Sequence, residues 1–177
     1  MRADLKHPPA PVYGLCESDF DYVLRLAKKV VESHRSLSRS QTEGLLGDST
    51  GGEIASDIRH YAYIETVFLW EYALWRLQGV LEGLITTVFL PPMGEKPLLG
   101  LEAKLKAMET AGFTIEPEDR RELLAWAGLR NAISHEPPER YRPIGLQEQD
   151  IQEYADLLRM QCKRWRVEAA TMRKAGA

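Results

Sequence analysis

The sequence contains little cysteine and no long hydrophobic run. Its 177 residues include only two cysteines, Cys16 and Cys162, which lie far apart and in no metal-binding spacing. We therefore expect free thiols in a reducing, cytoplasmic compartment rather than a disulfide framework. The most apolar stretch, residues 67–90, is interrupted by charged and polar side chains and lacks the ~18 continuous apolar residues of a membrane span. The N-terminus has no apolar segment of signal-peptide length.

Positive charge is not in excess either. Lys and Arg number 23 against 26 Asp and Glu, which leaves a net charge of -3. Proteins that coat nucleic acid non-specifically usually carry a large basic excess, so this class is disfavoured, although a local site for one phosphate remains open. No His, Cys and carboxylate set has metal-ligand spacing, and the sequence predicts neither a metal nor a cofactor. The Gly-rich residues 47–52 lack the Lys of a phosphate-binding P-loop.

Apolar residues recur at helical spacing along most of the chain. This pattern predicts an all-α protein, an up-and-down bundle of about five helices with one long central helix. The bundle is expected to form a single domain over residues 18–172, after an extended lead over residues 1–17. The central helix, from about 53 to 89, would span roughly 50 Å. Residues 39–52, just before it, are predicted to form a flexible loop.

Proline and glycine set the expected helix ends. A Pro-Pro pair that begins at residue 91 must end the central helix. Gly112 fits the C-cap of a short third helix, and Pro117 fits the first position of a fourth. The fourth helix must end near His135, because a second Pro-Pro pair follows. A last helix is expected from about 147 to 172. Its predicted buried stripe is Ile151, Tyr154, Leu158 and Trp165.

The end of the fourth predicted helix carries the most distinctive polar stretch, residues 130–135, which read Arg-Asn-Ala-Ile-Ser-His. Asn131 and His135 are four residues apart and lie about 40° apart around the helix axis. Arg130 and His135 are separated by about 140°, so they do not touch as neighbours but can border one cleft. Arg130 and Ser134, also four residues apart, lie on the neighbouring face of the same helix.

This stretch has an Arg, then a polar residue, three more residues and a His, and it stands at the end of the penultimate helix. The pattern resembles the motif of HEPN domains (higher eukaryotes and prokaryotes nucleotide-binding). The resemblance covers the helical plan over residues 18–172, and sequence detail over residues 129–135. Many HEPN domains are metal-independent RNases that act as symmetric dimers, and they occur in toxin–antitoxin and anti-phage systems. The resemblance therefore implies a homodimer that cleaves single-stranded RNA, as a toxin or defence component, with an antitoxin or regulatory protein as a further partner.

The resemblance also implies roles for the motif residues. Histidine as a residue type titrates near neutral pH, so the resemblance assigns His135 the role of general acid or base. Arg130 would clamp the phosphate through two hydrogen bonds and offset charge as it builds. Asn131 would orient the histidine or the phosphate. Ser134, beside Arg130, and Arg164, on the locally basic last helix, are expected to help bind substrate.

Two alternatives remain open, because the Arg-His pattern is short and also occurs at Arg2 and His7. The chain would then be a non-catalytic HEPN-like module that binds a protein partner or a nucleotide, or a helical interaction protein without a nucleic-acid role. Arg130 would pair with a Glu across the bundle, and His135 would be a helix-end residue favoured by the dipole. The HEPN toxins paired with a nucleotidyltransferase carry a modified Tyr two residues beyond the His. Pro137 stands there in this chain, so such modification is not expected.

Overall fold

The computed structural model describes residues 16–45, 49–90, 99–135 and 145–175. Within these ranges the chain forms helices and no strand, which confirms the predicted all-α class. None of the described helices is long and apolar enough to cross a membrane. The helices are α1 (Ser18–Glu43), α2 (Ser49–Leu84), α3 (Leu101–Thr110), α4 (Pro117–His135) and α5 (Glu148–Ala175).

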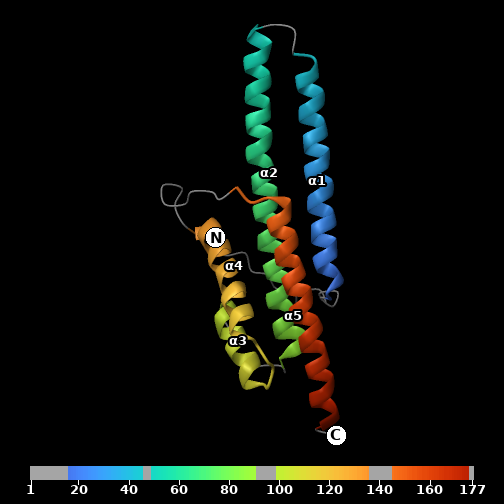
Figure 1. Ribbon diagram of the computed structural model, residues 1–177, viewed down its shortest axis with the longest axis vertical. Helices are drawn as coiled ribbons and strands as arrows, with labels where there is room; N and C mark the ends of the chain where they lie inside the picture. The colour runs from blue at the N-terminus through green and yellow to red at the C-terminus, as the bar shows by residue number, and fades with distance from the viewer. Residues whose placement is uncertain (1–15, 46–48, 91–98, 136–144, 176–177) are drawn as a thin grey trace, which may run out of the picture.

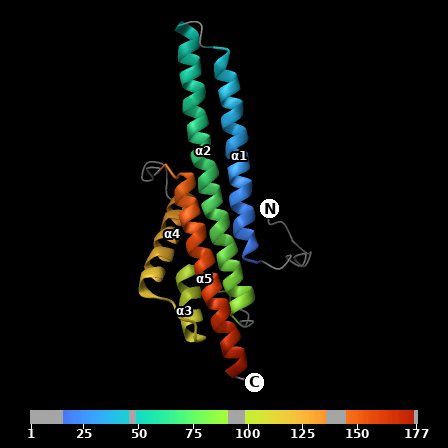
Figure 2. The same cartoon turned by 45° about the vertical axis from the view of Figure 1, so that its right-hand side comes forward.

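The two N-terminal helices, α1 and α2, form an antiparallel hairpin that gives the molecule its elongated shape (Figure 1). Helix α5 packs against α1 and α2 at one end of this hairpin, α4 packs against α2, and α3 packs against α4. A view turned by 45° shows the same arrangement (Figure 2). In both views, the far end of the α1–α2 hairpin extends beyond α4 and α5. Part of the hairpin is therefore only two helices thick.

The long central helix is confirmed, and it ends in a π-helical segment. Helix α2 continues without a break into η1 (Ile85–Phe89), where the N–H of Leu90 donates to the carbonyl of Ile85 at 2.9 Å. The wider turn of a π-helix accommodates an extra residue per turn. Here it allows Ile85 and Phe89, which are both buried, to face the core.

The predicted flexible loop at residues 39–52 is largely wrong, because most of this segment is helical. Helix α1 continues to Glu43 and α2 begins at Ser49, so that only residues 46–48 lie outside the described part. The lead at residues 1–15 also lies outside it.

Packing and a close backbone approach explain the longer helices. Ser38 and Thr42, on the last turns of α1, are buried against α2, so the contact between the two helices continues past the predicted end. A Cβ on Gly51 would lie 2.1 Å from the carbonyl oxygen of Leu45. Glycine at this position therefore lets the chain reverse within a short connection instead of a long loop.

The predicted helix ends around α3 and α4 are confirmed. After α3, Gly112 adopts a φ of 96°, in the left-handed region that glycine favours. The N–H of Gly112 donates to the carbonyl of Glu109 at 3.0 Å, and the N–H of Phe113 donates to the carbonyl of Met108 at 3.0 Å. This pair of bonds is the Schellman arrangement that closes a helix. Helix α4 runs from Pro117 to His135 as predicted.

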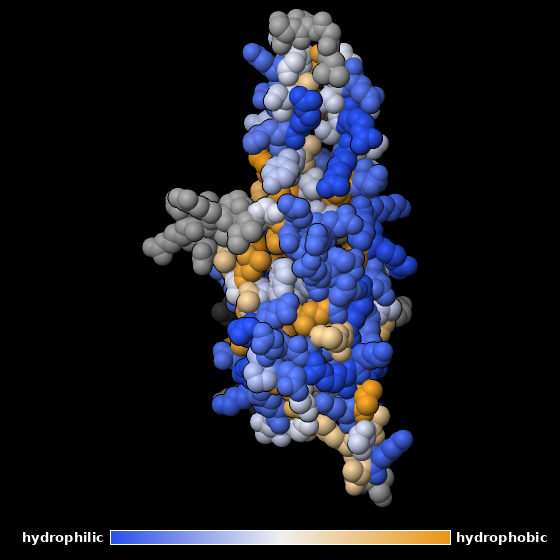
Figure 3. Space-filling model, in the orientation of Figure 1, coloured by the Kyte–Doolittle hydropathy of each residue, from blue (hydrophilic) through white to orange (hydrophobic). Residues whose placement is uncertain are grey.

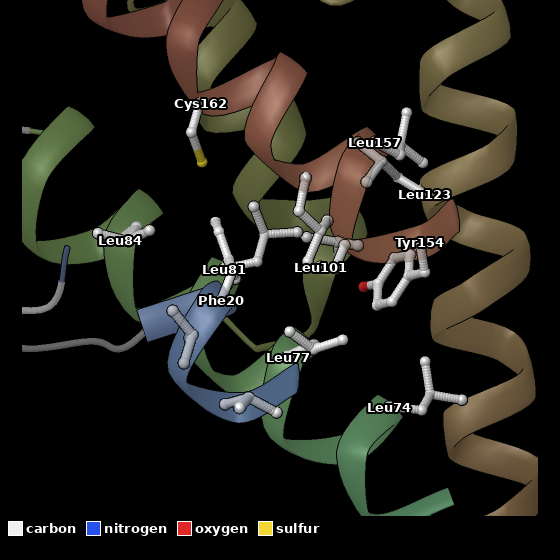
Figure 4. Packing of buried hydrophobic residues seen from close by; sticks show 14 of the residues in the cluster. Phe20, Leu74, Leu77, Leu81, Leu84, Leu101, Leu123, Tyr154, Leu157 and Cys162 are labelled. Atoms are coloured by element: carbon white, nitrogen blue, oxygen red, sulfur yellow. The ribbon is translucent and has the colours of Figure 1, made fainter. Parts of the chain in front are cut away.

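The core lies where α5 packs against α1, α2 and α4 (Figure 4). Leu77 and Leu81 of α2, Phe20 of α1, Leu123 of α4 and Tyr154 of α5 are all buried in this cluster. The outer face that Figure 3 displays is mostly hydrophilic, with hydrophobic side chains reaching the surface near the middle of the molecule. The predicted stripe of the last helix is confirmed, since Ile151, Tyr154, Leu158 and Trp165 are all fully buried.

Candidate functional site

The arginine of the motif lies against the central helix. Its guanidinium Nη2 donates to Oε1 of Glu82 on α2 at 3.0 Å. Both side chains are largely shielded from solvent, with 22% of Arg130 and 14% of Glu82 exposed. The ion pair therefore joins the end of α4 to the last turns of α2.

Glu82 is a shared acceptor for side chains of three helices. Lys104 of α3 approaches the second carboxylate oxygen at 2.6 Å. Gln78, one turn earlier on α2, donates its amide to Oε1 at 3.0 Å. Burial alone would raise the pKa of Glu82. Hydrogen bonds from Lys104 and Gln78, together with the positive charges of Lys104 and Arg130, outweigh burial and hold this pKa below its ordinary value.

A solvent-open pocket of about 350 Å³ borders this ion-pair cluster. Three of its lining residues are basic, Arg76, Lys104 and Arg130, against the single carboxylate of Glu82. The Nε of Arg130 is buried without a hydrogen-bond partner among the described residues. Arginine carries five N–H donors, so the guanidinium keeps capacity for a second acceptor besides Glu82. The pocket has the charge and the donors to hold an anion.

A buried tyrosine lies behind the cluster. Tyr154 stacks on Trp126 of α4, with ring centroids 4.8 Å apart. Burial and the nearby Glu82 raise the pKa of its phenol far above the ordinary value, so Tyr154 stays protonated and neutral. Its hydroxyl has no hydrogen-bond partner within the described ranges. Tyr154 therefore packs the wall of the site and does not titrate.

The other residues of the motif lie on the outer surface of α4. Asn131, Ser134 and His135 are exposed, and the Ser134 hydroxyl donates to the carbonyl of Arg130 at 2.9 Å. His135 is not among the residues that line the Arg130 pocket. It lies five residues further along the helix, about 7.5 Å along the axis and about 140° around it. One chain therefore brings Arg130, but not His135, to the pocket.

The structure does not bring Arg164 to the motif. The Arg164 guanidinium pairs with Asp119 in the first turn of α4 and approaches Glu116, the residue just before α4, at 3.9 Å. His135 is sixteen residues beyond Asp119, which corresponds to roughly 24 Å along a helix. Arg164, which was predicted to bind substrate, therefore lies far from the motif residues at the end of α4.

Sequence reasoning allowed for a pair between Arg130 and a Glu across the bundle, but it did not identify Glu82, Lys104 or Gln78 as members of the site. The spacing of Gln78 and Glu82, four residues apart, places them on one face of a helix. This spacing alone does not reveal that α4 packs on that face. Lys104 reaches Glu82 only because α3 lies beside η1 and α4, and no local pattern predicts this.

No three His, Cys, Asp or Glu side chains of the described ranges come together in a way that could hold a metal ion. Comparison of the chain with protein-family models, curated proteins and solved structures gives no match. The HEPN resemblance therefore rests on the motif and on the helical plan.

Proposed function

We propose that the chain is a metal-independent endoribonuclease that acts on single-stranded RNA as a homodimer, in the manner the HEPN resemblance implies. One observation carries the proposal. The motif arginine lines an open pocket whose basic residues outnumber its carboxylate, and the exposed motif histidine lies at the end of the same helix.

The pocket supplies the phosphate-binding half of the reaction. Glu82 neutralises one positive charge, while Arg76, Lys104 and Arg130 bring three. A phosphate that enters the pocket finds donors that are preorganised by burial and by the ion pairs. Such fixed donors stabilise negative charge as it grows on the phosphorus oxygens in the transition state.

The histidine supplies the proton-transfer half. In metal-independent cleavage a base removes the proton of the 2′-hydroxyl, and the 2′-oxygen attacks the phosphorus. The bond to the 5′-oxygen breaks, and an acid protonates that oxygen, which leaves a 2′,3′-cyclic phosphate and a 5′-hydroxyl. Imidazole can perform either transfer at neutral pH. A symmetric dimer supplies a second His135 and a second Arg130, which matters because one chain holds the two residues on different faces of α4.

Asn131 and Ser134 are assigned supporting roles. Both are exposed on the same turns of α4 as the catalytic pair, and Asn131 shares the face of His135. We expect Asn131 to orient the imidazole or the phosphate, and Ser134 to contact the RNA backbone. Arg164 is left out of the active site because it pairs with Asp119 at the other end of α4.

The second candidate function is a non-catalytic module that binds a protein partner or a nucleotide. The ion pair between Arg130 and Glu82 favours it, because a structural role already accounts for this contact. The two functions differ in what His135 does. A binding module loses no activity when the imidazole is removed, whereas the nuclease loses its acid or base.

The test is cleavage of a mixed-sequence single-stranded RNA in EDTA. We expect wild type to cut, and His135→Ala to lose at least about 100-fold in rate, the usual contribution of a positioned acid or base. Arg130→Ala should lose about 100-fold or more because it removes a donor that stabilises charge on the phosphate. The matched control is His60→Ala, which removes an exposed histidine on α2. Wild-type protein that binds RNA without cutting it would support the binding module. Activity that disappears in EDTA would contradict metal independence.

A toxin or defence role follows from the nuclease proposal. Expression of the wild-type chain should arrest growth of a bacterial host, and expression of His135→Ala should not. An antitoxin or regulatory protein would then be recovered as a factor whose co-expression restores growth. Equal growth arrest by both chains would contradict this role.

A further inference from the structure

A stripe of large apolar side chains is exposed along one face of α2. Its members are between 46% and 64% exposed. Counted from Ile54 to Trp75, successive members are seven, seven, four and three residues apart. At 100° per residue, this spacing keeps them within an arc of about 60° around the helix axis. From Val67 onward, the opposite side of α2 is buried in the core, so this part of the helix is apolar on two sides, as helices covered by further packing are. The exposed members are Ile54, Tyr61, Phe68, Tyr72 and Trp75.

Helix α1 extends this stripe across the hairpin. Tyr22, Leu26, Val30 and Leu37 are between 40% and 58% exposed. A groove of about 390 Å³ between the helices is lined by Tyr22, Leu26 and Val30 on one side and by Tyr72 on the other. We call these four residues and the five α2 residues together the hairpin face; the groove beside Tyr72 joins its α1 and α2 sides.

The hairpin face is large enough for a stable interface. An aromatic side chain buries ~150–250 Å² when it is fully covered. Five aromatic residues and four aliphatic ones, each about half exposed, therefore offer on the order of 700 Å². A standard interface buries about 800 Å² on each partner. Monomeric proteins rarely leave an apolar patch of this size open.

The charge of this surface fits a second copy better than a nucleic acid. The groove is lined by one acidic and one basic residue, Asp19 and Arg76. Beside the α2 stripe, Glu65 pairs with His34 of α1 at 2.7 Å. A surface without excess charge has little attraction for RNA, which binds through basic residues. An apolar face of this kind can pair with itself about a two-fold axis.

We infer that the hairpin face binds the hairpin face of a second copy of this chain, so that two α1–α2 hairpins form a four-helix bundle. The end of the hairpin beyond α4 and α5 is only two helices thick (Figures 1 and 2). Two packed helices bury little core, and a second pair on the open side is the usual stable solution. This inference rests on the proposed function in that it assigns a surface to the homodimer proposed there.

The hairpin face reaches the rim of the Arg130 pocket. Trp75 belongs to the face and also lines the pocket, where it stacks on Tyr72 with ring centroids 6.2 Å apart. Arg76 lines both the groove and the pocket. A second copy on the hairpin face therefore covers one edge of the pocket, which is open to solvent in the single chain.

The test is the mass of the full chain in solution, by light scattering and sedimentation in the absence of RNA. We compare wild type with Phe68→Glu/Tyr72→Glu, which places two charges in the middle of the face. The matched control is Tyr63→Glu, a 59% exposed tyrosine on the opposite side of α2. Circular dichroism verifies that each variant keeps its helix content.

We expect wild type and Tyr63→Glu to have the mass of two chains at micromolar concentration. Phe68→Glu/Tyr72→Glu should raise the dissociation constant by about 30-fold or more for each substituted side chain, as for the central residues of an interface. The inference is overturned if wild type is still a monomer at a concentration about 100-fold above the micromolar range in which we expect the dimer. A dimer that persists in the double variant, or that is lost in Tyr63→Glu, also overturns it. Because no RNA is present, these outcomes are independent of whether the chain is a nuclease.

Discussion

Removal of the Glu82 carboxylate should destabilise the fold strongly. Glu82→Ala leaves Arg130 and Lys104 without their anion, and their side chains are only 22% and 12% exposed. Breaking a buried ion pair by deleting one partner typically destabilises by about 3–5 kcal/mol. Partial solvent access to Arg130 reduces this, so we expect a loss of about 2–4 kcal/mol in the free energy of unfolding.

Thermal unfolding followed by circular dichroism is the assay. For a chain of this length, 1 kcal/mol corresponds to a Tm shift of about 2–4 °C. Glu82→Ala should therefore lower Tm by about 10 °C. Glu82→Gln keeps the shape and one acceptor oxygen, and its Tm should fall between those of wild type and Glu82→Ala.

The matched control for this experiment is Glu65→Ala on the same helix. The Glu65 side chain is 58% exposed and pairs with His34. Exposed pairs usually contribute less than about 1 kcal/mol, so Tm should change by no more than about 2–3 °C. Equal Tm values for Glu82→Ala and Glu65→Ala would refute the claim that Glu82 is the structural centre of the cluster.

Four further predictions follow from the same contacts. The pKa of Glu82 is lower in the folded state than its ordinary value of 4.5. The ionised carboxylate therefore stabilises the fold above pH 4.5, and this stabilisation is lost as the pH falls through the folded pKa. The decrease in Tm on acidification should consequently be smaller in Glu82→Gln, which has no carboxylate to protonate, than in wild type. In RNA-binding titrations, Glu82→Gln should also bind more tightly than wild type and with a steeper salt dependence, because the pocket gains positive charge. Burial raises the pKa of Cys162 to about 12, so a thiol reagent should modify Cys16 in the native protein and Cys162 only after denaturation. Trp165→Ala should destabilise by about 3–5 kcal/mol in urea unfolding, because the fully buried indole fills the core and donates to the carbonyl of Thr114.

The helical plan was predictable because its signals are local. The stripe around Tyr154, the proline at position 117 and the glycine at position 112 all act within one or two turns, and each has the predicted role. The prediction of a loop over residues 39–52 was largely wrong, because it relied on the tendency of glycine and serine to interrupt helices. Here the contact between the long helices overrides that preference.

The candidate site was predictable only in part. The motif identified Arg130 and His135, and helical geometry already placed them on different faces of one helix. The partners of Arg130 depend on how three helices pack, so Lys104 and Gln78 carry no local signal. The exposure of Trp75, in contrast to the burial of Trp70 and Trp165, also depends on which side of α2 the bundle covers.

The most direct test of the central claim is the identity of the RNA ends that the wild-type chain produces in EDTA, beside those from His135→Ala. The account predicts 2′,3′-cyclic phosphate and 5′-hydroxyl ends from wild type alone, and no cleavage of a matched RNA whose 2′-hydroxyls are methylated. Ends with a 5′-phosphate, or equal cleavage by wild type and His135→Ala, would contradict the assignment of Arg130 and His135 to a metal-independent ribonuclease site.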